Sequence, residues 1–130
     1  MSLKICIITP EEIFFNEEAE EIILPTNTGQ MGVLSNHAPL ITALDIGVML
    51  IRQKKTWNSL VLMGGFALIK QNKVTVLVNE VETEDMIDVA EAESSFTIAK
   101  QNFENATNAK EKVETNFIYK RARARLQATK

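Results

Sequence analysis

The sequence predicts a β-sandwich domain followed by an α-helical hairpin, that is, an all-β domain ahead of two antiparallel helices. Up to about residue 83, short apolar runs alternate with Gly, Pro and Asn at intervals of roughly ten residues, a pattern typical of antiparallel sandwiches. From residue 88 to residue 130 the chain has no Gly and no Pro, and Ala, Glu, Lys and Arg become frequent, which favours helix. We therefore divide the chain into a sandwich domain, residues 1–84, and a two-helix domain, residues 85–130.

The predicted strands are apolar, β-branched runs that end at conformational breakers. LKICIITP ends at Pro10, EEIILP ends at Pro25, and PLITAL begins at Pro39. The later runs are GVMLIRQ, TWNSLVLM, which breaks at Gly64 and Gly65, GFALIKQ and KVTVLVNE. In KVTVLVNE the valines alternate with Thr and Leu, as expected of a strand with one face on a core.

Two N-cap signatures begin the predicted helices, since Asp88 is followed by Glu91 and Asn108 by Glu111 at the spacing of a capping box. Apolar side chains at helical spacing then form one stripe on each helix. These positions are Val89, Ala92, Phe96, Ala99 and Phe103, and then Val113, Phe117, Ala124 and Ala128. Alanines bury little apolar surface, so we expect the hairpin to dock weakly on the sandwich and to be able to detach.

The composition excludes several classes of protein. One Cys in 130 residues rules out an internal disulfide, and one Cys with one His makes a conventional metal site unexpected. No apolar run approaches the ~20 residues of a membrane-spanning helix. The N-terminus resembles neither a signal peptide nor a transit peptide, so we expect the protein to be made where it works.

The net charge of −3 conceals a strong separation of charges along the chain. Residues 11–21 and 80–93 are rich in acidic residues and contain no basic residue. The charged residues among 117–130 are all basic. This separation suggests that the C-terminus seeks an acidic surface.

The stretch GQMGVLSNHAPLITALDIG carries the only histidine, His37, and offers a candidate site. Ser35 and Asp45 lie near it in sequence, but the members of a catalytic triad are brought together by the fold, so proximity is poor evidence. We assign no catalytic residue, and the alternative to an enzyme is a contact surface.

Two glycines of this stretch suggest how such a surface is built. The spacing of Gly29 and Gly32 does not fit a phosphate-binding loop, and no Lys-Ser or Lys-Thr follows. We expect both to adopt positive φ in a tight turn that holds Gln30 and Met31 outward. An exposed Met at a loop tip suits a contact surface as well as a solvent-facing loop.

The basic tail YKRARARLQA admits three interpretations. It is a solvated helix end whose bases complement the helix dipole, a binding element for nucleic-acid phosphates, or a binding element for an acidic protein. Against nucleic acid, the whole chain is acidic and Tyr119 is its one aromatic platform there. A free-standing nucleic-acid-binding module is kept as the alternative function. A small-molecule-binding sandwich has less support, since no convergent polar cluster is seen.

Three motifs, in their order and spacing, resemble the epsilon subunits of F-type ATP synthases of the chloroplast or cyanobacterial kind. They are LPTNTGQMGVLSNHAPLITALDIG, LMGGFALIKQNKVTVLVNEVE and the closing RARARL, and the resemblance covers the whole chain. It implies a flattened N-terminal β-sandwich and a C-terminal two-helix hairpin. It also implies a non-catalytic component of the central stalk that is clamped to the gamma subunit, seated on the c-ring, and able to restrain ATP hydrolysis through its mobile helices.

The resemblance further implies which residues make these contacts. The residues facing the c-ring would be Gly29, Gln30, Met31 and Gly32. The residues facing the gamma subunit would be His37, Ala38, Pro39 and Thr42. With the hairpin extended, the residues approaching the catalytic alpha and beta subunits, at acidic loops of beta, would be Lys120, Arg121, Arg123 and Arg125.

One departure from the family limits what is carried over. Some bacterial relatives bind ATP through Ile-Asp-x-x-Arg-Ala at the start of the first helix, where this chain has IDVAEA with Glu91 in place of the Arg. A carboxylate does not suit phosphate, so we assign no nucleotide, cofactor or metal, and expect Asp88 to serve only as a cap. The resemblance implies a peripheral protein on the stromal side of the chloroplast thylakoid, with the cyanobacterial thylakoid as the alternative.

Overall fold

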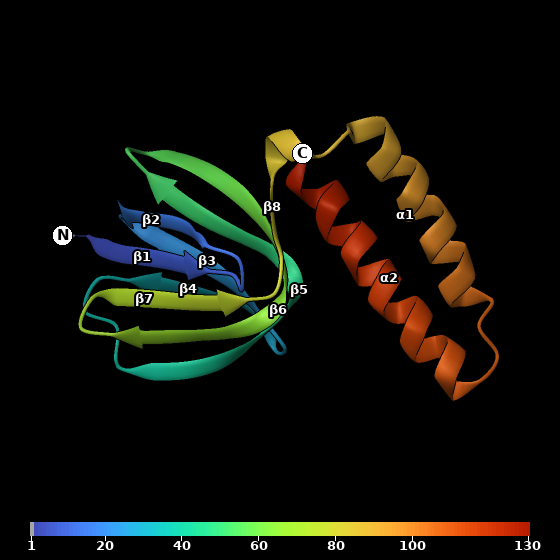
Figure 1. Ribbon diagram of the computed structural model, residues 1–130, viewed down its shortest axis with the longest axis horizontal. Coiled ribbons are helices and arrows are strands. Elements are labelled where there is room, and N and C mark those ends of the chain that lie inside the picture. The colour runs from blue at the N-terminus through green and yellow to red at the C-terminus, as the bar shows by residue number, and fades with distance from the viewer. Residues whose placement is uncertain (1) are drawn as a thin grey trace.

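A computed structural model describes residues 2–130 and places eight strands ahead of two α-helices (Figure 1). The strands are β1 (Leu3–Ile8), β2 (Ile13–Ala19), β3 (Glu21–Thr26), β4 (Gly29–Leu34), β5 (Leu40–Gln53), β6 (Thr56–Lys70), β7 (Lys73–Val78) and β8 (Val81–Thr83). A short 3-10 helix, η1 (Glu84–Met86), leads into the helices α1 (Val89–Glu104) and α2 (Ala109–Ala128). The predicted fold class, a β-sandwich followed by a helical hairpin, is confirmed.

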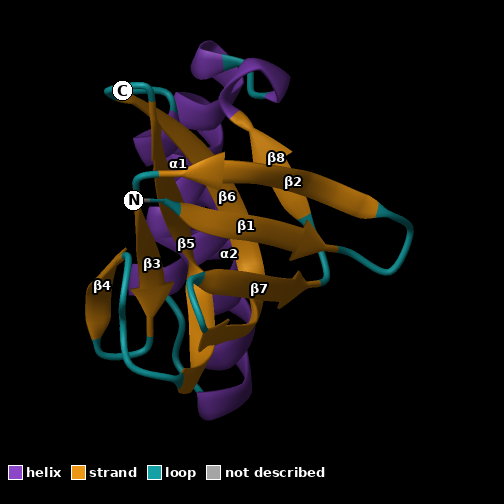
Figure 2. Ribbon diagram, turned by 90° about the vertical axis from the view of Figure 1, so that its left-hand side faces the viewer, coloured by secondary structure: helices purple, strands orange, loops and turns teal. Residues whose placement is uncertain are grey.

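The long β5–β6 hairpin runs through both layers of the sandwich (Figure 2). The strand order is β2-β1-β7-β6-β5-β3-β4, in which the second half of β6 pairs with β7 and its first half pairs with β8. The predicted break at Gly64 and Gly65 is wrong, because the backbone bends there, with φ of 84° and 143°, while pairing with β5 continues on both sides. β5 likewise continues through Gly47, where two strands had been expected.

β2 and β4, which are the two ends of the strand order, were not predicted from the sequence. β2 has three exposed polar residues at positions 16–18, and β4 contains two glycines. An edge strand pairs on one side only, and charged side chains there protect against aggregation. Such strands carry little of the β-branched pattern on which the predictions rested.

The sandwich has a core of its own, which includes no residue of either helix. Its largest fully buried side chains include Leu3, Ile5, Ile7, Ile22, Leu24, Met49, Ile51, Leu62 and Ile69. The alternating valines of β7 point into this core, as predicted. Most of the hydrophobic stabilisation of the first domain therefore comes from within the sandwich, and the hairpin adds only the cover over Val61 and Met63.

Both helices begin at the predicted caps. The Asp88 carboxylate accepts the backbone N–H of Glu91 at 3.1 Å, and the Asn108 side chain accepts that of Glu111 at 2.9 Å. In the folded hairpin α2 lies against β5 and β6, and α1 packs chiefly on the other side of α2 (Figure 1). The hairpin is therefore held on the sandwich mainly through α2.

The contact between the hairpin and the sandwich is thin, as expected. Against Val61 and Met63 of β6, the helix side chains that are fully buried are alanines, namely Ala92, Ala124 and Ala128, and Leu126 of α2 is partly buried beside them. Three other predicted stripe positions are exposed instead, namely Val89 (49%), Val113 (71%) and Phe117 (53%). The two on α2 are uncovered because the first turns of this helix project past the sheet (Figure 1).

Replacing Asn108 with alanine is expected to loosen α2, because the backbone N–H of Glu111 loses its acceptor. N-cap losses of this kind cost about 1 kcal/mol. Amide hydrogen exchange should show faster exchange in α2. Asn102→Ala, at an exposed position inside α1, is the matched control and should leave α2 unchanged. Equal exchange in α2 of both variants would contradict the cap's role.

Candidate functional site

The four residues expected to face the c-ring lie in β4 and not in a loop. Gly29 has the expected positive φ, 124°, but Gly32 does not, because the turn of the β3–β4 hairpin precedes Gly29. Gln30 is exposed as expected, whereas Met31 is half-buried and packs against the sandwich core. The open edge of β4 therefore presents Gly29, Gln30 and Gly32. Met31 holds the β3–β4 hairpin to the sandwich core.

His37 is a half-buried loop residue with a local hydrogen bond. Its Nδ1 donates to the carbonyl oxygen of Ala38 at 2.7 Å. Asp45, which lies near His37 in the sequence, does not contact it. Its two carboxylate oxygens accept hydrogen bonds from Lys120 Nζ at 3.0 and 3.2 Å. Asp45 therefore pairs with the helical hairpin, and it does not form a triad with His37.

The four residues expected to face the gamma subunit do not form one surface. Ala38 and Pro39 are exposed in the loop before β5. Thr42 lies opposite the core residue Ala67, on the inward side of β5, whereas its neighbour Ile41 points outward. Thr42 is therefore separated from the exposed part of this group.

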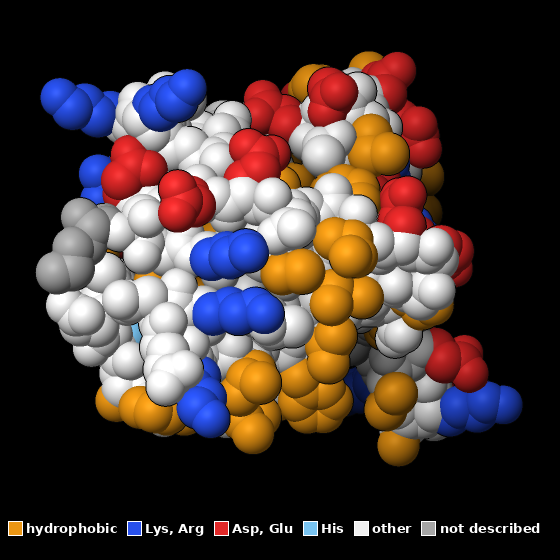
Figure 3. Space-filling view, turned by 60° about the vertical axis from the view of Figure 1, so that its left-hand side comes forward, with side chains coloured by type: hydrophobic (Ala, Val, Ile, Leu, Met, Phe, Trp, Pro, Cys, Tyr) orange, Lys and Arg blue, Asp and Glu red, His pale blue; other side chains and the backbone are white. Residues whose placement is uncertain are grey.

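An exposed apolar surface, which sequence reasoning missed, covers the outer face of β5, β6 and β7. We call it the sheet patch, formed by Ile41, Phe66, Leu68 and Leu77. It is continuous because Ile41 is paired with Leu68 and Phe66 with Leu77 in register. Figure 3 shows hydrophobic side chains gathered on this side of the molecule. The available signal was the second half of β6, FALI, which is apolar on both faces; contiguous exposed apolar surface of this kind marks an interaction site.

Three of the four cations that were expected to approach the beta subunits are paired with carboxylates of the sandwich. The pairs are Lys120 with Asp45 (3.0 Å), Arg121 with Glu80 (3.7 Å) and Arg125 with Glu82 (3.2 Å). The fourth cation, Arg123, lies over the ring of Tyr119 at 5.3 Å. The acidic surface that the C-terminus was expected to seek is thus present on the chain's own sandwich, and we call Asp45, Glu80 and Glu82 the acid row.

Arg125 is the most enclosed of these cations. Its side chain and that of Glu82 are 17% and 16% exposed, and the Arg125 Nε lies 3.2 Å from the Glu82 Oε1 without the alignment of a hydrogen bond. Its Nη1 also lies 4.0 Å from the carboxylate of Glu91 on α1. One arginine therefore joins β8, α1 and α2 through charge.

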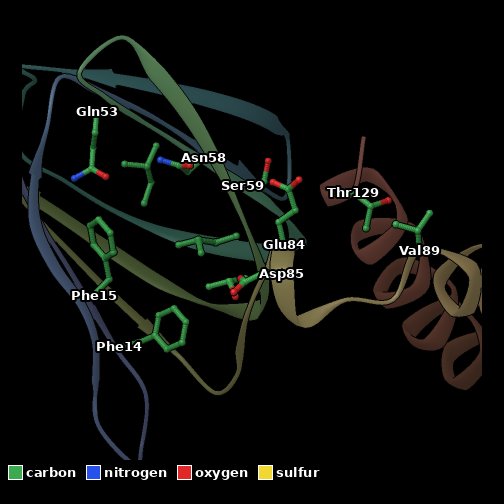
Figure 4. A pocket seen from close by; sticks show the side chains of 12 residues that line it. Phe14, Phe15, Gln53, Asn58, Ser59, Glu84, Asp85, Val89 and Thr129 are labelled. Atoms are coloured by element: carbon green, nitrogen blue, oxygen red, sulfur yellow. The ribbon is translucent and has the colours of Figure 1, made fainter.

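A cavity of about 580 Å³ lies beside the linker between the two domains (Figure 4). Phe14 and Phe15 of β2 line one side, η1 crosses it, and the hairpin contributes only Val89 and Thr129. The hairpin is therefore not sealed against the sandwich at the point where the chain enters it.

Two family models together match nearly the whole chain. Residues 2–84 match the beta-sandwich domain of the ATP synthase delta/epsilon chain, and residues 85–130 match the long alpha-helix domain of the same chain.

Curated relatives match over nearly their full length. The chain is 68% identical to the chloroplastic ATP synthase epsilon chain of Oltmannsiellopsis viridis, an alignment covering 98% of this chain and 97% of the relative. It is 66% identical to that of Tupiella akineta, with 98% of each chain covered, and 57% identical to that of Chlamydomonas reinhardtii, with 100% and 96% covered. None of these relatives lends support to a free-standing nucleic-acid-binding module.

Solved structures share the fold at low sequence identity. One chain of the Euglena gracilis mitochondrial ATP synthase superposes with a TM-score of 0.85 at 19% identity, covering 98% of this chain and 80% of that one. A chain from the central stalk and c-ring structure of the Tetrahymena thermophila mitochondrial ATP synthase gives 0.71 at 16% identity, covering 100% and 98%.

Proposed function

The chain belongs to the family of F-type ATP synthase epsilon subunits, and from this premise we propose that it is a non-catalytic rotor component of the central stalk. In this role it links the gamma subunit to the c-ring, supports proton-driven ATP synthesis and inhibits ATP hydrolysis through its C-terminal helices. Two domains divide the work, residues 1–84 as the anchor and residues 85–130 as the brake. The observation that carries this proposal is a thinly docked hairpin whose cations rest on exchangeable ion pairs.

The sandwich supplies two contact surfaces on one rigid body. The gamma subunit covers the sheet patch together with the adjoining loop that holds His37, Ala38 and Pro39. The c-ring meets the open edge of β4, where Gln30 is exposed between two glycines. A sandwich with a core of its own transmits torque between these surfaces without help from the hairpin.

The hairpin acts as a two-state brake. In the closed state, α2 lies on β5 and β6 and the acid row holds three of its cations. In the open state, the same cations and Arg123 reach acidic loops of the beta subunits, where charge-assisted contacts oppose rotation. A ligand or membrane energisation shifts such an equilibrium when the two states differ by a few kcal/mol, which the thin alanine contact provides.

The chloroplastic relatives support a location on the stromal side of the thylakoid membrane, held there by the complex. Among residues 2–130, no helix has the length and apolar character needed to cross a bilayer.

The test is ATP hydrolysis by an epsilon-depleted catalytic head that retains gamma, titrated with three proteins: the full chain, a version ending at Asp85, and the full chain with Arg121, Arg123 and Arg125 changed to Ala. We expect the full chain to inhibit. The truncated version, which keeps the whole sandwich core, should bind and compete with the full chain without inhibiting. The arginine variant should bind normally and inhibit weakly.

Two results would contradict the proposal. Full inhibition by the arginine variant would make the brake purely steric and exclude the electrostatic contact. A full chain that neither binds nor inhibits, but binds DNA or RNA at sub-micromolar strength with a strong salt dependence, would favour the alternative function.

A further inference from the structure

Three lysines stand side by side across the outer face of the sandwich. Lys4 of β1 is in register with Lys73 of β7, and Lys73 is in register with Lys70 of β6. All three are exposed, and none takes part in an ion pair formed within residues 2–130. We call them the lysine row.

The lysine row is unfavourable for the sandwich alone. Like charges directly opposite on neighbouring strands destabilise a sheet, by a few tenths of a kcal/mol to about 1 kcal/mol for each pair. Glu18 of β2, in register with Lys4, is the one carboxylate at the end of the row, and it lies beyond ion-pair distance. The row carries no core side chain, so neither packing nor charge balance within the fold accounts for it.

The lysine row borders the sheet patch. Two residues further along the same strands, on the same outward face, lie Thr75 and Leu68, and beyond them Leu77 and Phe66. A shallow hollow of about 300 Å³, lined by Leu68, Lys70, Gln71, Lys73 and Thr75, joins the row to the patch. An apolar centre with a charged margin is the usual arrangement of a protein interface.

We propose that the lysine row binds carboxylates of the protein that covers the sheet patch, so that the partner presents an apolar stripe bordered by Asp or Glu side chains. This inference rests on the proposed function, in which that partner is the gamma subunit. The apolar patch supplies the contact area. The row guides association and fixes the orientation of the two proteins, as charges at the margin of an interface do.

The experiment measures the affinity of the full chain for the epsilon-depleted ATP synthase core, which retains gamma, at low and high salt. The row variant carries Lys4→Gln, Lys70→Gln and Lys73→Gln. The matched control carries three changes at exposed lysines elsewhere, Lys54→Gln, Lys55→Gln and Lys100→Gln. We expect the row variant to bind roughly 3- to 30-fold more weakly at low salt, as for three margin charges, and the difference to shrink at high salt.

A second readout separates binding from folding. Because the row repels itself, the thermal midpoint of the free row variant should equal or exceed that of the unchanged chain. A row variant that binds like the control would overturn the proposal, and so would one that binds weakly because it is less stable.

Vesicles containing phosphatidylglycerol distinguish a lipid from a protein partner. If the row variant lost binding to these vesicles but kept full affinity for the core, the row would serve an anionic lipid and the proposal would be wrong. Failure of the unchanged chain to bind the core would instead refute the proposed function, and with it the partner on which this inference rests.

Discussion

Replacing Gly65 with alanine is expected to prevent stable folding of the sandwich. The backbone at this position has a φ of 143°, which L side chains rarely adopt, and an added Cβ would lie 2.1 Å from the carbonyl oxygen of Leu77. That oxygen belongs to the backbone of the paired strand β7, so no side-chain rotation relieves the overlap. We expect a loss of at least about 3 kcal/mol in the free energy of unfolding, a large part of what a domain of this size has.

The measurement is urea-induced unfolding followed by circular dichroism, with Gly32→Ala as the control. Gly32 also lies in a strand, but its φ is outside the positive range and a Cβ there would meet nothing within 4 Å. The control should therefore unfold at nearly the same urea concentration as the unchanged chain. An equal shift in both variants would show that the bend at Gly65 tolerates a side chain.

The fold was predictable where a local pattern determines the structure. Asp88 and Asn108 begin helices because their side chains accept an N–H three residues later, and that spacing is visible in the sequence. The alternating valines of β7 were predictable for the same reason. The bend at Gly64 and Gly65 was not, because glycines end a strand in one context and bend it in another, depending on the strands paired alongside.

The interaction surfaces depend on register and on tertiary packing. The separation of acidic and basic residues along the chain suggested an acidic partner for α2. Only the fold shows that Lys120 contacts Asp45, which lies 75 positions away in the chain. The sheet patch and the lysine row exist because β1, β6 and β7 meet in one register, which places Lys4 beside Lys73. Thr42 is paired with the buried Ala67 and its neighbour Ile41 with the exposed Leu68, so the two point to opposite faces of the sheet, and only the register shows which of them faces outward.

Glu82→Gln is expected to strengthen inhibition of ATP hydrolysis, and Arg125→Ala is expected to weaken it, although the two residues form one ion pair. Removing the Glu82 carboxylate leaves Arg125, which is 17% exposed, without its nearest counter-charge, so the closed hairpin loses about 1–2 kcal/mol. Arg125 itself remains available to the beta subunits. Arg125→Ala destabilises the closed state as well, but it also removes one of the contacts that act as the brake.

The measurements are the concentration for half-inhibition of the epsilon-depleted catalytic head and amide exchange in α2 of the free chain. Exchange in α2 should rise in both variants, because each breaks the same pair. A loss of 1–2 kcal/mol corresponds to roughly a five- to thirtyfold shift toward the open state, so the half-inhibitory concentration of Glu82→Gln should fall about fivefold or more while that of Arg125→Ala rises.

Glu12→Gln is the control for a lost carboxylate, since Glu12 is exposed outside the acid row and makes no ion pair within residues 2–130. It should change neither quantity. If Glu82→Gln opened the hairpin without strengthening inhibition, the acid row would not compete with the beta subunits for the same cations. Opposite changes in the half-inhibitory concentration for the two partners of one ion pair are expected only if Arg125 binds either the sandwich or the beta subunits, and not both at once.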